Sequence, residues 1–251
     1  MQNILRTILL LPVLVGLAPP IGAQVIDNKK EYGECMVLTR RNPEQAFEKA
    51  SAWQGLGGGE AAKHCVAVAL IGMGKYQDAA TRLEKLAEES KQSAGIRAEM
   101  LAQAGQAWFL VGENNRAHNA QTSALKLTPK NREILVDRAV TLGTINNHQA
   151  AIDDLTLAIA IAPNHPDAYV YRASSLRFLD KLDQAMADAE AALVLTSNSH
   201  PEALLERGML RRLKGDNKGA RQDWLRVIEF VPETPTADAA RRNIELLEIK
   251  Q

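Results

Sequence analysis

Apolar and small residues recur at three- and four-residue spacing over residues 98–131, which predicts two amphipathic helices. The first helix presents one such face, made by Leu101, Ala104, Gly105 and Trp108. A polar turn at 112–115 ends it, and a second apolar face continues until Pro129 stops the second helix. Small residues on both faces let the two backbones approach closely. The segment therefore predicts an antiparallel helical hairpin.

The same pattern returns after 34 residues and again further along the chain. A small residue, two mostly Ala positions and Pro keep their offsets in three segments: Gly105, Ala117, Ala124 and Pro129; Ala139, Ala151, Ala158 and Pro163; Gly208, Ala220, Val227 and Pro232. A period of this length indicates stacked repeats, because one hairpin alone cannot bury its apolar face. The chain is expected to be a helical solenoid.

These offsets resemble those of the tetratricopeptide repeat (TPR) family. The resemblance is strongest in 98–131, 132–165 and 201–234, and 166–199 follows with Ser197 where Pro would stand. Residues 60–97 are interpreted as a divergent repeat with extra polar residues near 90–95, 24–59 as an N-terminal hairpin of the same type, and 235–251 as a capping helix. The resemblance implies an all-α fold, a right-handed α-α superhelix of about five to six hairpins closed by that helix.

Residues 1–23 have the pattern of a secretory signal peptide. Arg6 precedes an apolar run from Ile8 to Ala18, and two prolines and small residues lead to Ala23. The run is about half of the ~20 apolar residues that a membrane-spanning helix needs, which disfavours a permanent anchor. We expect cleavage after Ala23 and a periplasmic or secreted protein, in a compartment where thiols oxidise.

Charge and composition narrow the classes of partner. The 251 residues carry 30 basic and 30 acidic side chains, so no overall field draws nucleic acid or an anionic membrane surface to the chain. The five histidines lack the spacing and the cysteine partners of a metal site. We expect no metal, no cofactor and no nucleic acid.

Three Arg–Asp pairs are sixteen residues apart and repeat with the solenoid: Arg138 with Asp154, Arg172 with Asp188, and Arg207 with Asp223. The TPR resemblance implies an apolar residue at the Arg position, and a charge in such a place needs a partner. We expect each Arg to clamp the Asp on the second helix of its own hairpin. A ladder of exposed Arg side chains that binds a polyanion is the alternative.

The two cysteines, Cys35 and Cys65, lie on the first helices of successive predicted hairpins. An even count and an oxidising compartment favour a disulfide, and two buried reduced thiols are the alternative. His64 beside Cys65 raises the question of thiol catalysis. Neighbours on a helix point about 100° apart, however, so His64 is poorly placed as a base for that sulfur, and we expect no catalytic residue.

The TPR resemblance also implies that first helices line a concave groove in which ligands bind. By that analogy the groove residues are Ala102, Gln106, Phe109, Val136, Val140, Val170, Ser174, Arg177, Leu205, Met209 and Arg212. Apolar side chains dominate this set and suit a helix or an extended peptide. The alternative is that neighbouring hairpins cover several of them. An acidic row, Glu99, Glu133, Asp167 and Glu202, is explained by the positive end of each helix.

The sequence thus favours a non-catalytic exported scaffold that binds a protein or peptide of unknown identity in its groove, in cell-envelope assembly or secretion. A structural or regulatory subunit of a permanent envelope complex is one alternative. A thiol-dependent enzyme or small-ligand protein is another, with Cys65 or the groove as its site. Fold alone does not decide among them.

Overall fold

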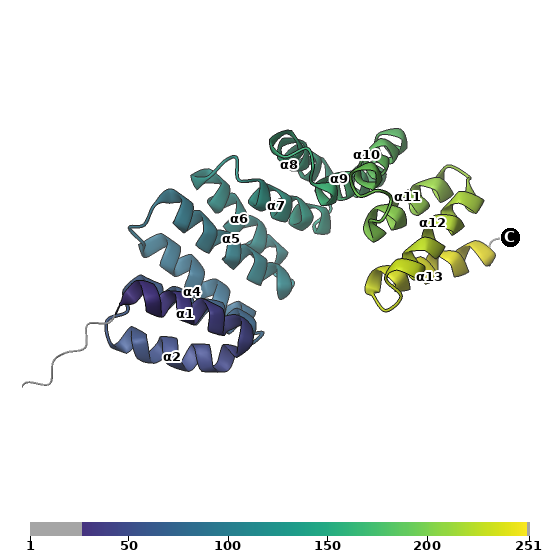
Figure 1. Cartoon of the computed structure of the whole chain (residues 1–251). Helices are drawn as coiled ribbons and strands as arrows, with labels where there is room; N and C mark the ends of the chain where they lie inside the picture. The colour runs from purple at the N-terminus through teal and green to yellow at the C-terminus, as the bar shows by residue number, and fades with distance from the viewer. Residues whose placement is uncertain (1–26, 250–251) are drawn as a thin grey trace, which may run out of the picture.

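The computed structural model describes residues 27–249, and these residues form thirteen α-helices and no strand (Figure 1). In chain order the helices are α1 (Asn28–Arg41), α2 (Pro43–Gly55), α3 (Gly59–Gly72), α4 (Tyr76–Glu89), α5 (Ala94–Leu110), α6 (Asn114–Leu127), α7 (Arg132–Thr144), α8 (His148–Ile161), α9 (Pro166–Phe178), α10 (Leu182–Leu195), α11 (Pro201–Leu213), α12 (Asn217–Phe230) and α13 (Pro235–Glu248). The predicted signal peptide lies outside the described residues. Within them, no helix is long and apolar enough to cross a bilayer.

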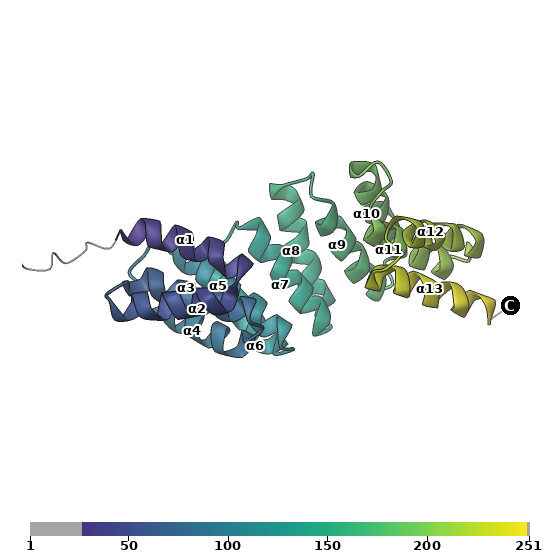
Figure 2. The ribbon, with the colours of Figure 1, turned by 60° about the horizontal axis from the view of Figure 1, so that its bottom comes forward.

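Consecutive helices pair into six hairpins, from α1–α2 to α11–α12, and α13 packs against the last one. The first helices of neighbouring hairpins also touch, as α7 does with α9 and α9 with α11. Figures 1 and 2 show an elongated, curved row of hairpins with α1 and α13 at opposite ends. The all-α repeat superhelix expected from the sequence is confirmed.

Close approach of the two helices within a hairpin depends on small side chains. A Cβ on Gly105 of α5 would lie 2.7 Å from Gln121 Cγ of α6, and a Cβ on Gly208 of α11 would lie 2.7 Å from Trp224 Cδ1 of α12. Both distances are far inside van der Waals contact. The small residue in the first helix therefore makes room for a large buried side chain in the second.

Each first helix from α3 to α11 is followed by one residue of positive φ: Gly74, Gly112, Asn146, Asp180 and Gly215. Left-handed backbone costs least for Gly, and Asn and Asp tolerate it better than other residues. From Gly112 to Asp180 the position repeats every 34 residues, and one more residue separates Asp180 from Gly215. The chain reverses direction in the same way in each of these hairpins.

The loop after α10 accommodates that extra residue. Ser197 and Asn198 have φ values of 51° and 61°, and the Asn198 N–H donates to the Leu193 carbonyl at 2.7 Å. This local turn ends α10 without the Pro found in the other repeats. Residue positions in α11 are consequently shifted by one against the period of the preceding hairpins.

The core is a row of adjoining clusters rather than one centre. Trp108 lies in a cluster built by α3 to α6, and Trp224 lies in one built by α9 to α13; both indoles are completely buried. Each cluster joins a hairpin to the next, as expected when a repeat cannot bury its apolar face alone. The stack therefore holds the first helices at a fixed spacing along one surface.

The inserted polar residues of the divergent repeat also have a defined place. α4 ends at Glu89, Ser90 is buried, and its hydroxyl donates to the Glu60 carboxylate at 2.7 Å. Ser93 then caps α5, which begins at Ala94 and is 17 residues long, whereas the other helices have 13 or 14. The insertion thus adds an extra turn to the start of α5.

Candidate functional site

The three sixteen-residue pairs lie inside their hairpins as bidentate ion pairs. Nε and Nη2 of each Arg donate to the two carboxylate oxygens, at 2.7 Å in both bonds of Arg138–Asp154, 2.7 and 2.8 Å in Arg172–Asp188, and 2.9 and 2.7 Å in Arg207–Asp223. All three carboxylates are buried. The guanidinium groups are therefore directed into the hairpins, which leaves no ladder of exposed Arg for a polyanion.

Two threonines extend these clamps between repeats. Arg138 Nη1 donates to Thr122 of the preceding hairpin at 3.3 Å, and Arg172 Nη1 donates to Thr156 at 3.2 Å. The threonines are 34 residues apart, so their period was available in the sequence. Their role depends on the direction of the third guanidinium nitrogen, which spacing alone does not give.

Cys35 of α1 and Cys65 of α3 form a disulfide, with their Cα atoms 6.3 Å apart. Because Cys65 is bonded to Cys35, it offers no thiol for catalysis. The neighbouring His64 points elsewhere and bonds to Tyr32 and Gln103. The thiol-enzyme alternative therefore has no reactive group in the structure.

The groove predicted from the sequence lies along the first helices α5, α7, α9 and α11. Ten of its eleven residues are exposed or half-buried: Ala102, Gln106, Phe109, Val136, Val140, Ser174, Arg177, Leu205, Met209 and Arg212. Val170 is the exception and corrects the prediction. It is only 7% exposed and packs in a cluster with Ala203 and Leu204 of the next hairpin, since α9 and α11 lie in contact there.

A set of polar residues on the same surface was missed. Each follows one of the predicted groove residues along the chain: Gln103, Asp137, Tyr171 and Glu206. Three of them bond to the preceding first helix. His64 Nε2 lies 2.9 Å from Gln103 Oε1, Gln106 donates to Asp137 at 2.7 Å, and Arg177 donates to Glu206 at 2.6 and 3.3 Å. Their 34-residue recurrence was the signal that could have identified them.

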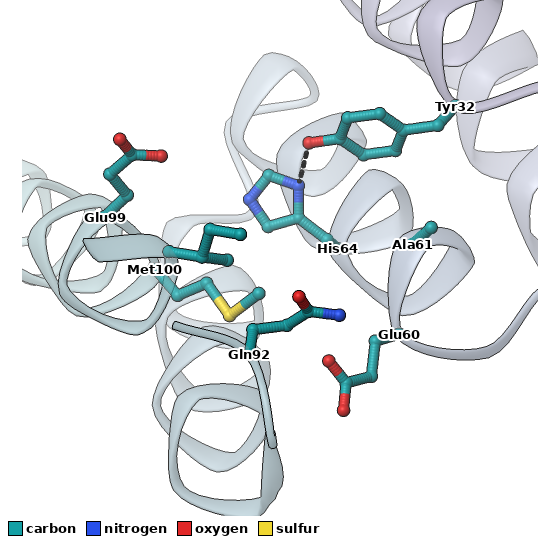
Figure 3. Close-up of a pocket in the computed structure, with 8 residues that line it drawn as sticks. Tyr32, Glu60, Ala61, His64, Gln92, Glu99 and Met100 are labelled. Carbon is teal, nitrogen blue, oxygen red and sulfur yellow. Dashed lines mark hydrogen bonds between the residues drawn. The ribbon is translucent and has the colours of Figure 1, made fainter. Parts of the chain in front are cut away.

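Two hollows open among the first helices. The N-terminal recess, a cavity of about 340 Å³, is lined by Tyr32, Glu60, Ala61, His64, Gln92, Ile96, Glu99 and Met100 (Figure 3). The central hollow, of about 220 Å³, is lined by Ala139, Val140, Gly143, Thr144, His148, Tyr171, Ser174, Ser175 and Phe178. Both have the mixed apolar and polar lining of ligand sites.

His64 is the polar centre of the N-terminal recess. The Tyr32 hydroxyl lies 2.9 Å from Nδ1, and Figure 3 shows this contact across the cavity. A neutral ring fits both contacts, with Nδ1 accepting from Tyr32 and Nε2–H donating to Gln103. Burial lowers the pKa of His64, and burial with the Glu99 charge raises the pKa of Tyr32. Both side chains are therefore uncharged at neutral pH.

The central hollow brings α7, α8 and α9 together. The His148 ring stacks on Phe178 with centroids 4.5 Å apart, and its Nδ1 has no hydrogen-bond partner among residues 27–249. Gly143 leaves open space beside this pair, because a Cβ there would meet no atom within 4 Å. The predicted groove residues Val140 and Ser174 lie on the wall of the hollow.

A model of the tetratricopeptide repeat family matches residues 172–238, from α9 to the start of α13. Together with the 34-residue period and the hairpin stack, this decides the family. The chain is a TPR protein. No cluster of three or more His, Cys, Asp or Glu side chains suited to a metal occurs within the described part of this TPR chain.

Two curated relatives match parts of the TPR array. The DnaJ homolog subfamily C member 7 homolog of Dictyostelium discoideum is 27% identical over 128 residues, which are 49% of this chain and 23% of that protein. Tetratricopeptide repeat protein 36 of Danio rerio is 36% identical over 80 residues, which are 31% of this chain and 43% of that protein. The chain thus spans less than half the length of the relatives it matches.

Solved TPR structures resemble the fold more widely than the sequence. PilF of Pseudomonas aeruginosa covers 86% of this chain and 97% of its own, with a TM-score of 0.67 and 14% identity. YrrB, described as a TPR protein with an unusual peptide-binding site, covers 78% of this chain and 98% of its own, with a TM-score of 0.58 and 18% identity. At these identities the likeness concerns the fold alone.

Acidic side chains surround the middle of the TPR groove. Burial raises the pKa of Asp137, and burial together with the charges of Asp167, Glu202 and Asp137 raises the pKa of Tyr171. Asp167 also lies 2.9 Å from His200 Nε2, so helix-end stabilisation is not the only contact of the acidic row. The groove has a negative potential beside the central hollow.

Proposed function

We propose that this TPR protein is a non-catalytic scaffold that holds a segment of another protein in the groove of its first helices. The central hollow carries this proposal. It places half-buried Val140 and Ser174, the Phe178 ring and an unpartnered His148 nitrogen around one opening on that surface. A hollow of about 220 Å³ has room for one large apolar side chain of a bound segment.

The hollow lies between the first helices of consecutive repeats, where an extended or helical peptide can run along the stack. YrrB supports the analogy as a TPR protein with a described peptide-binding site. The fold supplies a rigid surface before binding, so little ordering of the scaffold is needed when a partner binds. Recognition then depends on the side chains that line the hollow.

We further propose that the protein is exported to the periplasm or secreted and acts in cell-envelope assembly or secretion. The signal-like residues 1–23 support export, and so does the Cys35–Cys65 disulfide, which suits an oxidising compartment. N-terminal sequencing of protein recovered from fractionated cells tests this. A chain that begins at Gln24 outside the cytoplasm agrees with the proposal, and an unprocessed cytoplasmic chain contradicts it.

Site-specific photocrosslinking in cells tests the groove. A photoreactive residue at position 174 is expected to capture a defined partner, and Val140→Glu is expected to abolish the adduct while helicity stays unchanged. Val194→Glu is the matched control, because Val194 is 76% exposed on the second helix α10, outside the residues that line either hollow. An adduct that persists in Val140→Glu, or disappears equally in both variants, contradicts the groove as the contact surface.

A further inference from the structure

The N-terminal recess is built by features that the other repeats lack. α1 supplies Tyr32, and the inserted segment between α4 and α5 supplies Gln92. The extra turn at the start of α5 supplies Ile96. Figure 3 shows these elements closing around His64 of α3. The cavity is therefore particular to this part of the chain and is not a copy of the groove further along.

The lining of the recess contains acids and no cationic group. A hydrogen bond from Ser90 is the main cause that lowers the pKa of Glu60, which keeps this carboxylate ionised. Glu99 has no hydrogen-bond or ion-pair partner within residues 27–249, and its charge reaches both Tyr32 and His64. Because His64 is neutral, the lining carries two uncompensated negative charges.

The rest of the lining is suited to an apolar stem. Ala61, Ile96 and Met100 provide aliphatic and thioether surface, and the Tyr32 ring provides an aromatic wall. Long basic side chains bury their methylenes against such surface and keep the charge at a polar rim. The ring of Tyr32 also attracts a cation through its negative face. A volume of about 340 Å³ accommodates one such chain.

We propose that the N-terminal recess binds the cation-tipped alkyl side chain, of the lysine or arginine type, of a polypeptide that lies along the first helices. The stem packs against Ile96 and Met100, and the cation lies toward Glu99 and Glu60. A carboxylate or phosphate is disfavoured here by both acids. The origin of the side chain in a bound polypeptide rests on the proposed function, whereas the cation preference rests on the recess alone.

Two small probes of nearly the same shape test the preference: n-pentylguanidinium and its neutral counterpart n-pentylurea. Titration of the purified protein is followed by NMR through the Met100 methyl group and the His64 ring. We expect saturable shifts with the guanidinium, and at least about 5-fold weaker binding of the urea, since one exposed charge contact is worth about 1 kcal/mol. Glu99→Gln is expected to weaken guanidinium binding by a similar factor.

Glu88→Gln provides the control, because it makes the same change in charge on an exposed part of α4 outside the recess. It is expected to leave binding of both probes unchanged. Equal binding of the two probes, an unaffected Glu99→Gln variant, or no saturable shift at Met100 overturns the proposal. Loss of crosslinking at position 174 would instead remove the proposed groove function and leave these titrations unaffected, so the two failures are distinguishable.

Discussion

Arg172 and Asp188 are joined by two parallel hydrogen bonds, from Nε at 2.7 Å and from Nη2 at 2.8 Å, between the first and second helices of one hairpin. Asp188 is buried, and its charge raises the pKa of Arg172. The same guanidinium reaches Thr156 in the preceding hairpin. One side chain thus links two helices of a repeat and also links that repeat to its neighbour.

Removal of one partner from this clamp is expected to destabilise more than removal of both. Asp188→Ala leaves a largely buried guanidinium without its carboxylate, which costs about 3 kcal/mol or more. The double variant Arg172→Met with Asp188→Ala removes the charge as well and is expected to recover part of that loss. Urea unfolding, with hydrogen exchange in α9 and α10, measures both variants.

Lys85→Ala serves as the control, since it removes an exposed ion pair with Glu89 and is expected to change the free energy of unfolding by less than about 1 kcal/mol. A harmless Asp188→Ala, or a double variant less stable than the single one, would show that the pair does not act as a clamp.

The ion pairs and the hairpins could be read from the sequence because both repeat with the period. A sixteen-residue separation joins facing positions of two antiparallel helices, so Arg172 and Asp188 were identifiable together. The third bond, to Thr156, depends on side-chain direction and was not predicted. Val170 was misplaced for a related reason. The period gives its helix face but not how closely α11 packs against α9, and that packing buries it.

The polar side of the groove was missed because alternation along the first helices was interpreted from apolar positions alone. Asp137 and Tyr171 recur with the same period, yet isolated polar residues on a helix are usually solvent-exposed. The N-terminal recess lay further beyond sequence reasoning. Tyr32, His64 and Glu99 come from three helices, and an insertion rather than a repeat unit brings their elements together.

Two glycines in first helices are expected to respond to alanine in opposite directions. Gly208→Ala places a methyl group against the buried Trp224 indole, whose Nε1 donates to the Leu205 carbonyl at 3.2 Å, and should cost about 1–3 kcal/mol. Gly143→Ala points a methyl group into open space and should gain up to about 1 kcal/mol from helix propensity. Urea unfolding curves compare the two. Equal effects would contradict the packing described at Gly208.

The disulfide is expected to stabilise the N-terminal hairpins in particular. Cys35 and Cys65 are 30 residues apart, and closing such a loop contributes about 3–4 kcal/mol in the chain-entropy account. Reduction, or the double variant Cys35→Ala with Cys65→Ala, should speed hydrogen exchange in α1 to α3 and leave α9 to α12 unchanged, since repeats contact only their neighbours. Intact mass after alkylation without reductant checks the bond itself. Uptake of alkylating agent by the unreduced protein would show that the bond is absent.

Stability of the N-terminal recess is expected to fall as the pH is lowered below about 6.5, the unperturbed pKa of histidine. Burial lowers the pKa of His64 in the folded chain, so between that lower value and about 6.5 the unfolded chain binds a proton that the folded chain does not. The contribution of His64 is therefore complete above this window and is lost as the pH falls through it. NMR titration of the His64 ring gives its pKa directly, and hydrogen exchange in α1 and α3 at pH 7.5 and 5.5 gives the local stability. His64→Gln should flatten the pH dependence of that exchange, whereas His118→Gln on α6, away from the recess, should leave it as in the unaltered protein. A folded-state pKa for His64 at or above the ordinary value would contradict the account, because a ring held neutral by burial must resist protonation.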